Sequence, residues 1–406
     1  MPTLGDRIRK LRKQQKMTLE VLAGTELTKG MLSLIENNKA NPSMDSLNYI
    51  AERLNVDVTE LLEEVSTQEL REVLDKAELL SNTKYEDLTD KHKQIIDLIE
   101  PYVPKLTQGY EAARLLEIYG RHLESEEILK QVATMYEQLN LIAKRAEIGT
   151  LFALIPFTKR NYQEALDILL AERAQLEKNP LWIDPLTRLD YDYFEAVFYF
   201  AVGKYEDAIR AMEKAIQYST KHKIFKQVDN LYRLAAGQAM IVQNEEKRQH
   251  YLNKLRAYCE FADDLDSKTF ILFSEIHCLN SFKKMYKEAD LLYSTSPLKV
   301  DAKKKIFTPY FLLERGKTLF GLNRFEGAIE KLATLVIPEY THHPFDLSMF
   351  YEKDAYLALC YLALDQKEKA IESIEKAVEN ITQMPDTPYK TFIFEVNEKV
   401  QRANIT

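Results

Sequence analysis

Side chains that could do chemistry are sparse in this chain of 406 residues. The densest group of possible metal ligands lies in the stretch IPEYTHHPFD and consists of Glu339, His342, His343 and Asp346. A metal site needs several such groups around one point, and adjacent histidines in a loop rarely provide them. The common phosphate-loop, His-Glu-x-x-His, Cys-x-x-Cys and Gly-x-Ser-x-Gly motifs do not occur. The sequence therefore predicts no metal, no cofactor and no enzyme activity.

Positive charge gathers at the N-terminus, although the net charge of the whole chain is −8. The first 16 residues contain one acidic side chain, Asp6, and the following basic ones: Arg7, Arg9, Lys10, Arg12, Lys13 and Lys16. A basic stripe attached to an acidic body suits contact with a polyanion, although most such stripes are only solvated helix faces.

The cysteine content and the hydropathy indicate the cellular compartment in which the protein works. Three widely spaced cysteines are typical of a reducing compartment without a disulfide framework. No apolar run approaches the roughly 18 residues that span a bilayer, and the first residues lack the apolar core of a signal peptide. We therefore expect a cytoplasmic protein with no membrane contact.

The first 65 residues are expected to form five short helices. The first covers about 4–15, and Thr18, Thr28 and Ser43 have the residue type and position of N-caps for the next three. Asn37 and Asn38 end the third helix, because asparagine tolerates the left-handed conformation of a helix exit. Thr59 is expected to cap the fifth helix. Two short helices joined by a tight turn in such a bundle are typical of a helix-turn-helix.

These residues resemble the lambda-repressor-like (XRE) DNA-binding domain through the stretches RIRKLRKQQKMT, LA, LSLIENNKANPS and LNVDVTELL. The resemblance implies that the helix at 28–36 enters the major groove of double-stranded DNA and that Arg12 and Glu36 form a buried pair. It implies base contacts from Lys29, Gly30, Met31 and Ser33, and phosphate contacts from Thr18, Thr28, Asn37 and Lys39. Leu19 and Leu34 depart from the usual pattern, so a bundle that no longer binds DNA is the alternative.

The remaining residues have helical patterns throughout and contain an internal repeat. A small residue recurs before an aliphatic run, at Ala165, Ala208, Ala289, Ala328 and Ala370, while Arg248 stands at that position in one copy. The period of about 40 residues resembles a lengthened tetratricopeptide repeat. The predicted fold is all-α: domain 1–65, connector helices 66–104, and a right-handed superhelix of about seven repeats within 105–406.

A repeat superhelix has a concave groove that binds peptides. On the repeat register, the groove side chains are predicted to be Tyr193, Phe200, Asn230, Arg233, Ser274, Tyr310 and Lys317. Two alternatives to groove contacts remain. The aromatic rings of DYDYFEAVFYF could form the core between repeats, and Asn230 and Arg233 could lie on an exposed helix face.

An XRE domain joined to lengthened tetratricopeptide repeats resembles the Rgg, Rap, NprR, PlcR and PrgX family of Gram-positive bacteria. The resemblance implies a homodimeric, DNA-binding transcription regulator gated by a short signalling peptide, as in quorum sensing. Two alternatives stay open. One is a Rap-like protein that binds or dephosphorylates a response regulator, with Gln94, Gln108 or Gln131 as candidate polar groups, and the other is a protein-binding scaffold.

Overall fold

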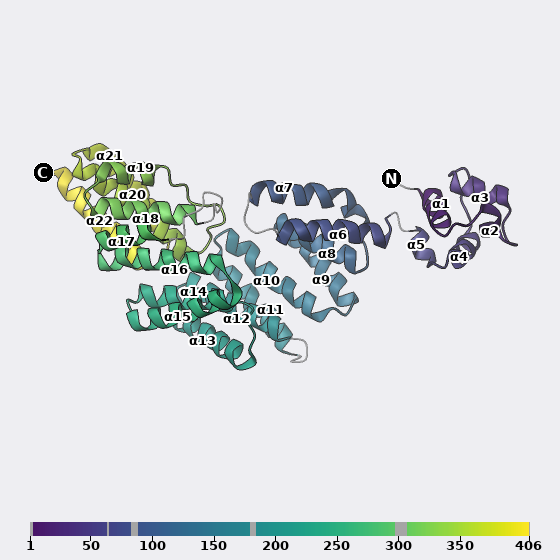
Figure 1. Ribbon diagram of the computed structural model, residues 1–406, viewed down its shortest axis with the longest axis horizontal. Coiled ribbons are helices and arrows are strands. Elements are labelled where there is room, and N and C mark those ends of the chain that lie inside the picture. Colours follow the sequence, from purple (N-terminus) through teal and green to yellow (C-terminus); the bar gives the residue numbers. More distant parts are fainter. Residues whose placement is uncertain (1–2, 63–64, 83–87, 179–183, 297–306, 406) are drawn as a thin grey trace. The chain divides into compact units, whose positions relative to one another are not determined.

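The computed structural model describes residues 3–62, 65–82, 88–178, 184–296 and 307–405, and all regular structure within these ranges is helical (Figure 1). The chain divides into two compact units, one ending at Asn140 and the other beginning at Leu141. The predicted all-α class is confirmed.

The N-terminal domain is a bundle of five helices around an apolar core that includes Ile8, Leu32 and Ile50, none of them exposed. Its helices are α1 (Leu4–Gln14), α2 (Leu19–Ala23), α3 (Lys29–Glu36), α4 (Met44–Arg53) and α5 (Val58–Leu62).

Side-chain caps start three of these helices where the sequence predicts them. The oxygens of Thr18, Thr28 and Ser43 accept hydrogen bonds from the backbone N–H three residues later. The prediction for the fifth helix was wrong, because α5 begins at Val58 and Thr59 therefore lies inside it. The end of the predicted stretch, at 63–64, lies outside the described residues.

Four α-helices and a short 3₁₀ segment complete the first unit. They are α6 (Thr67–Asn82), α7 (Leu88–Ile99), η1 (Glu100–Lys105), α8 (Tyr110–His122) and α9 (Glu126–Gln138). Two ion pairs join α6 to α8: Arg71 to Glu111 at 2.7 Å and Arg114 to Glu78 at 2.9 Å.

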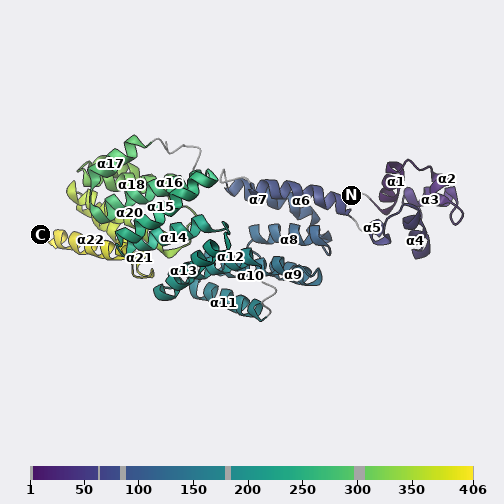
Figure 2. The ribbon, with the colours of Figure 1, turned by 60° about the horizontal axis from the view of Figure 1, so that its bottom comes forward.

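The second unit consists of antiparallel helix pairs followed by one further helix (Figure 2). The first three pairs are α10 (Ile142–Thr158) with α11 (Tyr162–Glu177), α12 (Pro185–Ala201) with α13 (Tyr205–His222), and α14 (Val228–Ile241) with α15 (Glu245–Ala262). The last three are α16 (Leu265–His277) with α17 (Tyr286–Thr295), α18 (Thr308–Gly321) with α19 (Phe325–Ala333), and α20 (Pro344–Ala363) with α21 (Lys367–Ile381). The π-helical segment η3 (Cys278–Lys283) extends α16, and α22 (Pro388–Ile405) ends the array. With α8 and α9, the described residues form the seven predicted pairs.

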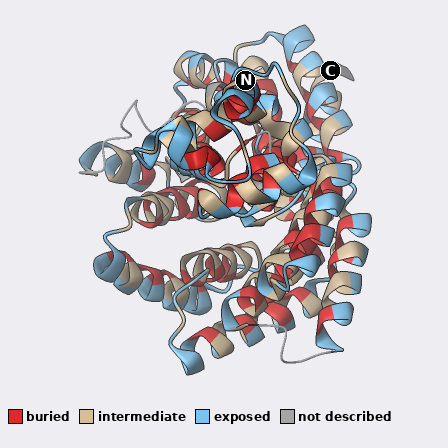
Figure 3. Cartoon of the chain, turned by 90° about the vertical axis from the view of Figure 1, so that its right-hand side faces the viewer, coloured by how far each residue is buried: buried red, intermediate tan, exposed pale blue. Residues whose placement is uncertain are grey.

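The repeating small residues mark where helices cross. Ala165, Ala208, Ala289, Ala328 and Ala370 are all fully buried. A methyl group lets two helix backbones approach closely, whereas a longer side chain would hold them apart. On most helices buried residues alternate with exposed ones, whereas α20 is buried on nearly every side (Figure 3).

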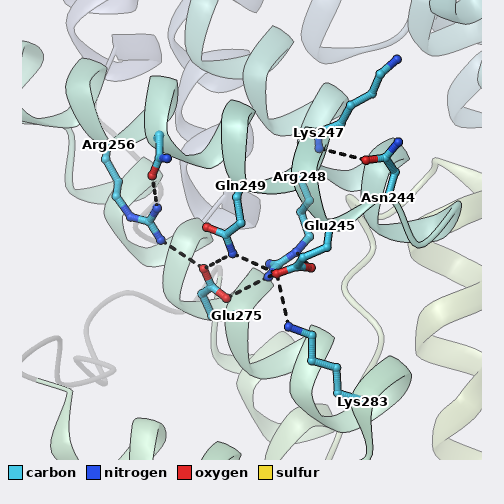
Figure 4. A network of polar contacts seen from close by, with 9 residues as sticks. Asn244, Glu245, Lys247, Arg248, Gln249, Arg256, Glu275 and Lys283 are labelled. Atoms are coloured by element: carbon cyan, nitrogen blue, oxygen red, sulfur yellow. Dashed lines mark hydrogen bonds and ion pairs between the residues drawn. The ribbon is translucent and has the colours of Figure 1, made fainter.

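Arg248 occupies this crossing position in α15 and is only 1% exposed. Its guanidinium donates to Glu245 at 2.9 Å and to Glu275 of α16 at 3.1 Å (Figure 4). Its Nη1 atom is buried without a hydrogen-bond partner among the described residues. The α15–α16 crossing therefore has a buried guanidinium at the position that a buried alanine occupies in five other pairs.

Contacts between distant parts of the sequence close the second unit on itself. The hydroxyl of Tyr162 donates to the carbonyl of His342 at 2.7 Å, and that of Tyr205 donates to the carbonyl of Asp386 at 2.8 Å. The rings of Tyr205 and Phe345 are stacked, with centroids 6.1 Å apart. The helices near the start of the unit are thus held directly against the segments that flank α20 and α21.

Candidate functional site

The start of α3 is open and carries the side chains predicted to contact bases. Lys29, Gly30 and Met31 are exposed, and Ser33 is half-buried, while Leu32 and Ile35 face the core. A Cβ at Gly30 would meet nothing closer than the Thr28 hydroxyl, at 3.9 Å. None of the described residues of the domain therefore covers this end of the helix.

The Lys29 ammonium is paired with the carboxylate of Glu20 on α2, and both side chains are about 60% exposed. Exposed pairs of this kind contribute little free energy, because water screens both charges. Lys29 can therefore leave Glu20 for a stronger acceptor at small cost.

The four predicted phosphate contacts lie around both ends of α3 and the start of α2. The hydroxyls of Thr18 and Thr28 already accept from their own helices. Asn37 donates to the carbonyl of Ser33 at 2.7 Å and accepts from Arg9. Lys39 is exposed and follows Asn38, whose φ of 58° is the predicted left-handed exit.

A buried ion pair fixes α3 against α1, as the family resemblance implies. Arg12 donates to both carboxylate oxygens of Glu36, at 2.6 and 2.8 Å, and to the carbonyl of Met17 at 2.8 Å. The hydrogen bond with Glu36 raises the pKa of the Arg12 guanidinium. Sequence reasoning missed Gly5, where a Cβ would clash with the carbonyl oxygen of Ile35. A glycine inside a helix was the available signal.

The second unit contains a pocket of about 270 Å³ whose walls come from α12, α14, α16, α20 and α22. It includes the following of the predicted groove residues: Tyr193, Phe200, Asn230, Arg233 and Ser274. These residues lie in three successive helix pairs, and the register of the repeat places their side chains on one side.

The two other predicted groove residues do not line this pocket. Tyr310 lies behind the wall, with its ring centroid 5.3 Å from that of Phe273 and 4.7 Å from that of Phe350. Lys317 is fully buried and pairs with Glu352 at 2.5 Å and with Glu314 at 3.1 Å.

Polar atoms without partners face or adjoin the pocket. Ser274 is 1% exposed, and its hydroxyl makes no hydrogen bond among the described residues. The Nε atom of Arg233 is likewise buried without a partner, while its Nη2 donates to the Ser267 hydroxyl at 2.6 Å. Buried polar groups are normally hydrogen-bonded, so an unsatisfied one at a cavity indicates a place for a ligand's polar groups.

Among the pocket residues that were not predicted are three with titratable side chains: His343, Asp346 and Tyr389. The first two belong to the loop cluster considered for a metal, but no group of His, Cys, Asp or Glu in the described residues could hold a metal ion. They reach the pocket because His343 lies against Val197, 146 residues away in the sequence. A local sequence pattern contains no signal for such a contact.

A network of buried polar groups lies behind Tyr389. The hydroxyl of Tyr389 is 2.9 Å from Nε2 of His277, whose Nδ1 is 2.7 Å from Glu314. Burial alone would raise the pKa of Glu314, but Lys317 and His277 lower it to about 2. The network thus keeps a carboxylate charged inside the core and links α16, α18, α20 and α22.

Within the described residues, no helix has the length and apolar character that crossing a membrane requires.

Two protein families match parts of this chain, one at its N-terminal end and one near its C-terminal end. Residues 5–66, which run from the first turn of α1 to beyond α5, match the helix-turn-helix domain family. The N-terminal domain is a helix-turn-helix domain. Residues 357–381, from α20 into α21, match the tetratricopeptide repeat. Among curated proteins, none matches the chain.

Several solved structures are similar to this chain. One is PlcR of Bacillus thuringiensis in complex with the peptide PapR7 and DNA, at 18% identity and a TM-score of 0.37, over 65% of this chain and 96% of that one. Another is the pheromone receptor Rgg2 of Streptococcus dysgalactiae, at 14% identity and a TM-score of 0.31, over 66% and 98%. The competence regulator ComR of Streptococcus vestibularis with its signalling peptide XIP has 18% identity and a TM-score of 0.22, over 99% of both chains. PlcR and an Rgg protein are members of the group that the sequence motifs resemble.

Proposed function

We propose that this chain is a cytoplasmic transcription regulator that binds promoter DNA through α3 and is gated by a short signalling peptide. The observation that carries the proposal is the joining, in one chain, of an open helix-turn-helix with a repeat pocket that contains unpaired polar atoms. No catalytic function is proposed.

The DNA-binding part rests on the helix-turn-helix domain and the geometry of α3. The helix is held rigidly by the Arg12–Glu36 pair, while its first residues stay uncovered. The basic residues of α1 and Lys39 provide positive charge for phosphates, which supplies affinity independent of sequence. Lys29, Met31 and Ser33 are the side chains available for reading base edges.

The peptide-binding part rests on the pocket. An extended peptide presents a backbone N–H and C=O at every residue, and these need partners when water is excluded. Ser274, Asn230 and Arg233 offer a hydroxyl, an amide and a guanidinium along one wall. The aromatic rings that line the same pocket would contact apolar side chains of the peptide.

Coupling between the two sites would act through a dimer. Helix-turn-helix dimers read two half-sites about one helical turn of DNA apart. A peptide that binds one arrangement of the repeats better than another shifts the population toward it. If the repeats form the dimer contact, that shift changes the spacing of the two α3 helices.

The proposal is tested by isolating genomic DNA bound to the full-length protein in its host, with and without medium from a dense culture. We expect a few sharp promoter sites whose occupancy changes with the medium. Sharp sites that are indifferent to the medium would contradict peptide gating, and an absence of sites in both conditions would contradict the regulator itself.

A further inference from the structure

The charged groups of the pocket do not balance one another. Three ionisable side chains that change or carry charge near neutral pH line it: Arg233, His343 and Asp346. The charge that each presents to a ligand depends on the groups around it.

The positive charge of Arg233 is offset inside the protein. Its guanidinium lies 3.4 Å from Asp229 and 3.5 Å from Asp264, and it also donates to Ser267. Two carboxylates surround one guanidinium, so this group brings no net positive charge to the pocket. What remains available is the Nε–H as a hydrogen-bond donor.

His343 is neutral in this arrangement. Its Nδ1 accepts from the backbone N–H of Phe345 at 3.2 Å, so Nε2 holds the proton and donates to the carbonyl of Val197 at 3.2 Å. Both ring nitrogens are therefore used by backbone groups. Burial lowers the pKa of His343 to about 4, which agrees with a neutral ring.

Asp346 is the remaining charge. It lies in the first turn of α20, and within the described residues its carboxylate makes no ion pair and no hydrogen bond. Burial raises the pKa of Asp346 to about 6, and no cation offsets this shift. Near pH 7 the group is still mostly ionised. Asp346 is half-buried, and an ionised carboxylate that loses part of its hydration is costly unless a cation or donors satisfy it.

The walls around Asp346 suit a particular kind of side chain. Aromatic rings of Tyr193, Phe200, Phe273 and Phe345 line the same pocket, and the Ser274 hydroxyl is unpaired beside them. Lysine and arginine have an apolar stem and a charged head, and aromatic faces attract such cations. At about 270 Å³ the pocket is at or below the small end of ligand sites, so it holds one or two residues of a peptide rather than all of it.

We propose that this pocket is a cation-selective subsite, in which Asp346 receives a positively charged group of the bound peptide and Ser274 and Arg233 receive its backbone. The inference rests on the proposed peptide binding and adds the chemical class of the ligand. The cation is a lysine or arginine side chain or the α-ammonium of the peptide, since these share the same chemistry at a carboxylate.

The test is selection from synthetic heptapeptide libraries by the immobilised full-length protein. One library has free N-termini and the other is N-acetylated, so that only side-chain cations remain in the second. We expect roughly tenfold or greater enrichment of cationic peptides, because charge-assisted hydrogen bonds in a dry site exceed those at a surface. Enrichment in both libraries assigns a side chain, and enrichment in the free library alone assigns the α-ammonium.

Three variants test whether Asp346 causes the preference for cationic peptides. Asp346→Asn keeps the shape of the side chain and should abolish the enrichment, while Asp346→Lys should reverse it toward aspartate and glutamate. The matched control is Asp365→Asn, which removes one charge at an exposed position between α20 and α21. It should leave the preference of the wild-type protein unchanged. Far-ultraviolet circular dichroism checks that each variant is folded.

The outcomes separate the two proposals. Peptides retained without preference for cations, or with a preference that Asp346→Asn leaves intact, would overturn the subsite and leave peptide binding standing. No retention of any peptide by the wild-type protein would overturn peptide binding and the subsite together.

Discussion

Lys29 and Lys39 are two exposed lysines at opposite ends of the same short helix, with different surroundings. Lys29 lies at the open start of α3 and is paired with Glu20. Lys39 lies beyond the helix exit at Asn38. The first position projects toward a major groove and the second toward the phosphate backbone, if α3 docks as helix-turn-helix recognition helices do.

Replacing these two lysines with alanine should have different effects. Lys29→Ala should weaken binding to the specific operator by about 1–3 kcal/mol and leave binding to unrelated DNA nearly unchanged. Lys39→Ala should weaken binding to all sequences similarly and reduce the slope of log K against log salt by about 1. Fluorescence anisotropy with an operator duplex and a scrambled duplex, over a range of salt, measures both. Equal losses for the two variants on both duplexes would contradict the division into base and phosphate contacts.

The residues of the DNA-binding domain could be predicted because its contacts are short-range in sequence. The caps at Thr18, Thr28 and Ser43 follow from residue type and position next to each helix start, whereas the pair of Arg12 with Glu36 was implied by the resemblance to the XRE domain. Thr59 could not be placed as well, since helix boundaries depend on competing caps that a propensity argument does not rank.

At the scale of elements, Arg248 is the exception to the small residue that the repeat has at each helix crossing. The five alanines fill crossings that need only a methyl group. At α15 and α16 a long, buried side chain fills the crossing instead, and its charge is met by Glu245 and Glu275. Its Nη1 atom is buried without a hydrogen-bond partner among the described residues. This arrangement therefore stabilises the crossing less than a fully hydrogen-bonded one would.

Substitution of Arg248 separates the volume of the side chain from its charge. Arg248→Ala should lower the free energy of unfolding by roughly 2–4 kcal/mol, because it leaves a cavity between two helices. Arg248→Met keeps most of the volume and should lower it by less than about 1.5 kcal/mol, because the partly exposed carboxylates of Glu245 and Glu275 keep Lys283 and Arg256 as partners. Hydrogen exchange of amides in α15 and α16 measures the local stability. Equal losses in the two variants would indicate that the charge, and not the packing, holds this crossing.

The spacing of small residues made the helix pairs predictable, because each crossing joins neighbours in the chain. The same repeat register was less reliable for predicting which side chains of the later pairs face the groove. Lys317 was assigned to the groove, yet the structure buries it between Glu314 and Glu352. The periodicity of one helix does not show which neighbour covers it.

At the scale of the second unit, closure creates the pocket. Its walls come from helices between α12 and α22, and the bonds of Tyr162 in α11 and Tyr205 in α13 hold these early helices against the segments that flank α20 and α21. His343 and Asp346 could not be predicted as pocket residues, because they become neighbours of α12 and α14 only through this closure.

Removing the two closing hydroxyls should loosen the unit without unfolding its helices. Each hydrogen bond contributes about 1 kcal/mol, so the double variant Tyr162→Phe, Tyr205→Phe should disfavour the closed form by roughly 2 kcal/mol. Small-angle X-ray scattering should show an increased radius of gyration, and the affinity for a selected peptide should fall by up to about thirtyfold. Tyr199→Phe is the matched control, since its hydroxyl donates to neither closing segment in the described part of the chain. Unchanged peptide affinity in the double variant would show that closure does not form the pocket.

The long sequence separation of these closing contacts also fixes when the pocket can exist during synthesis of the protein. Helix pairs joined by neighbouring residues can form while the ribosome is still translating, whereas contacts across 146 to 181 residues must wait for their distant partner. Tyr389, at the start of α22, is the last wall residue to be made. The helix-turn-helix domain, made first, can therefore fold long before its chain can hold a peptide.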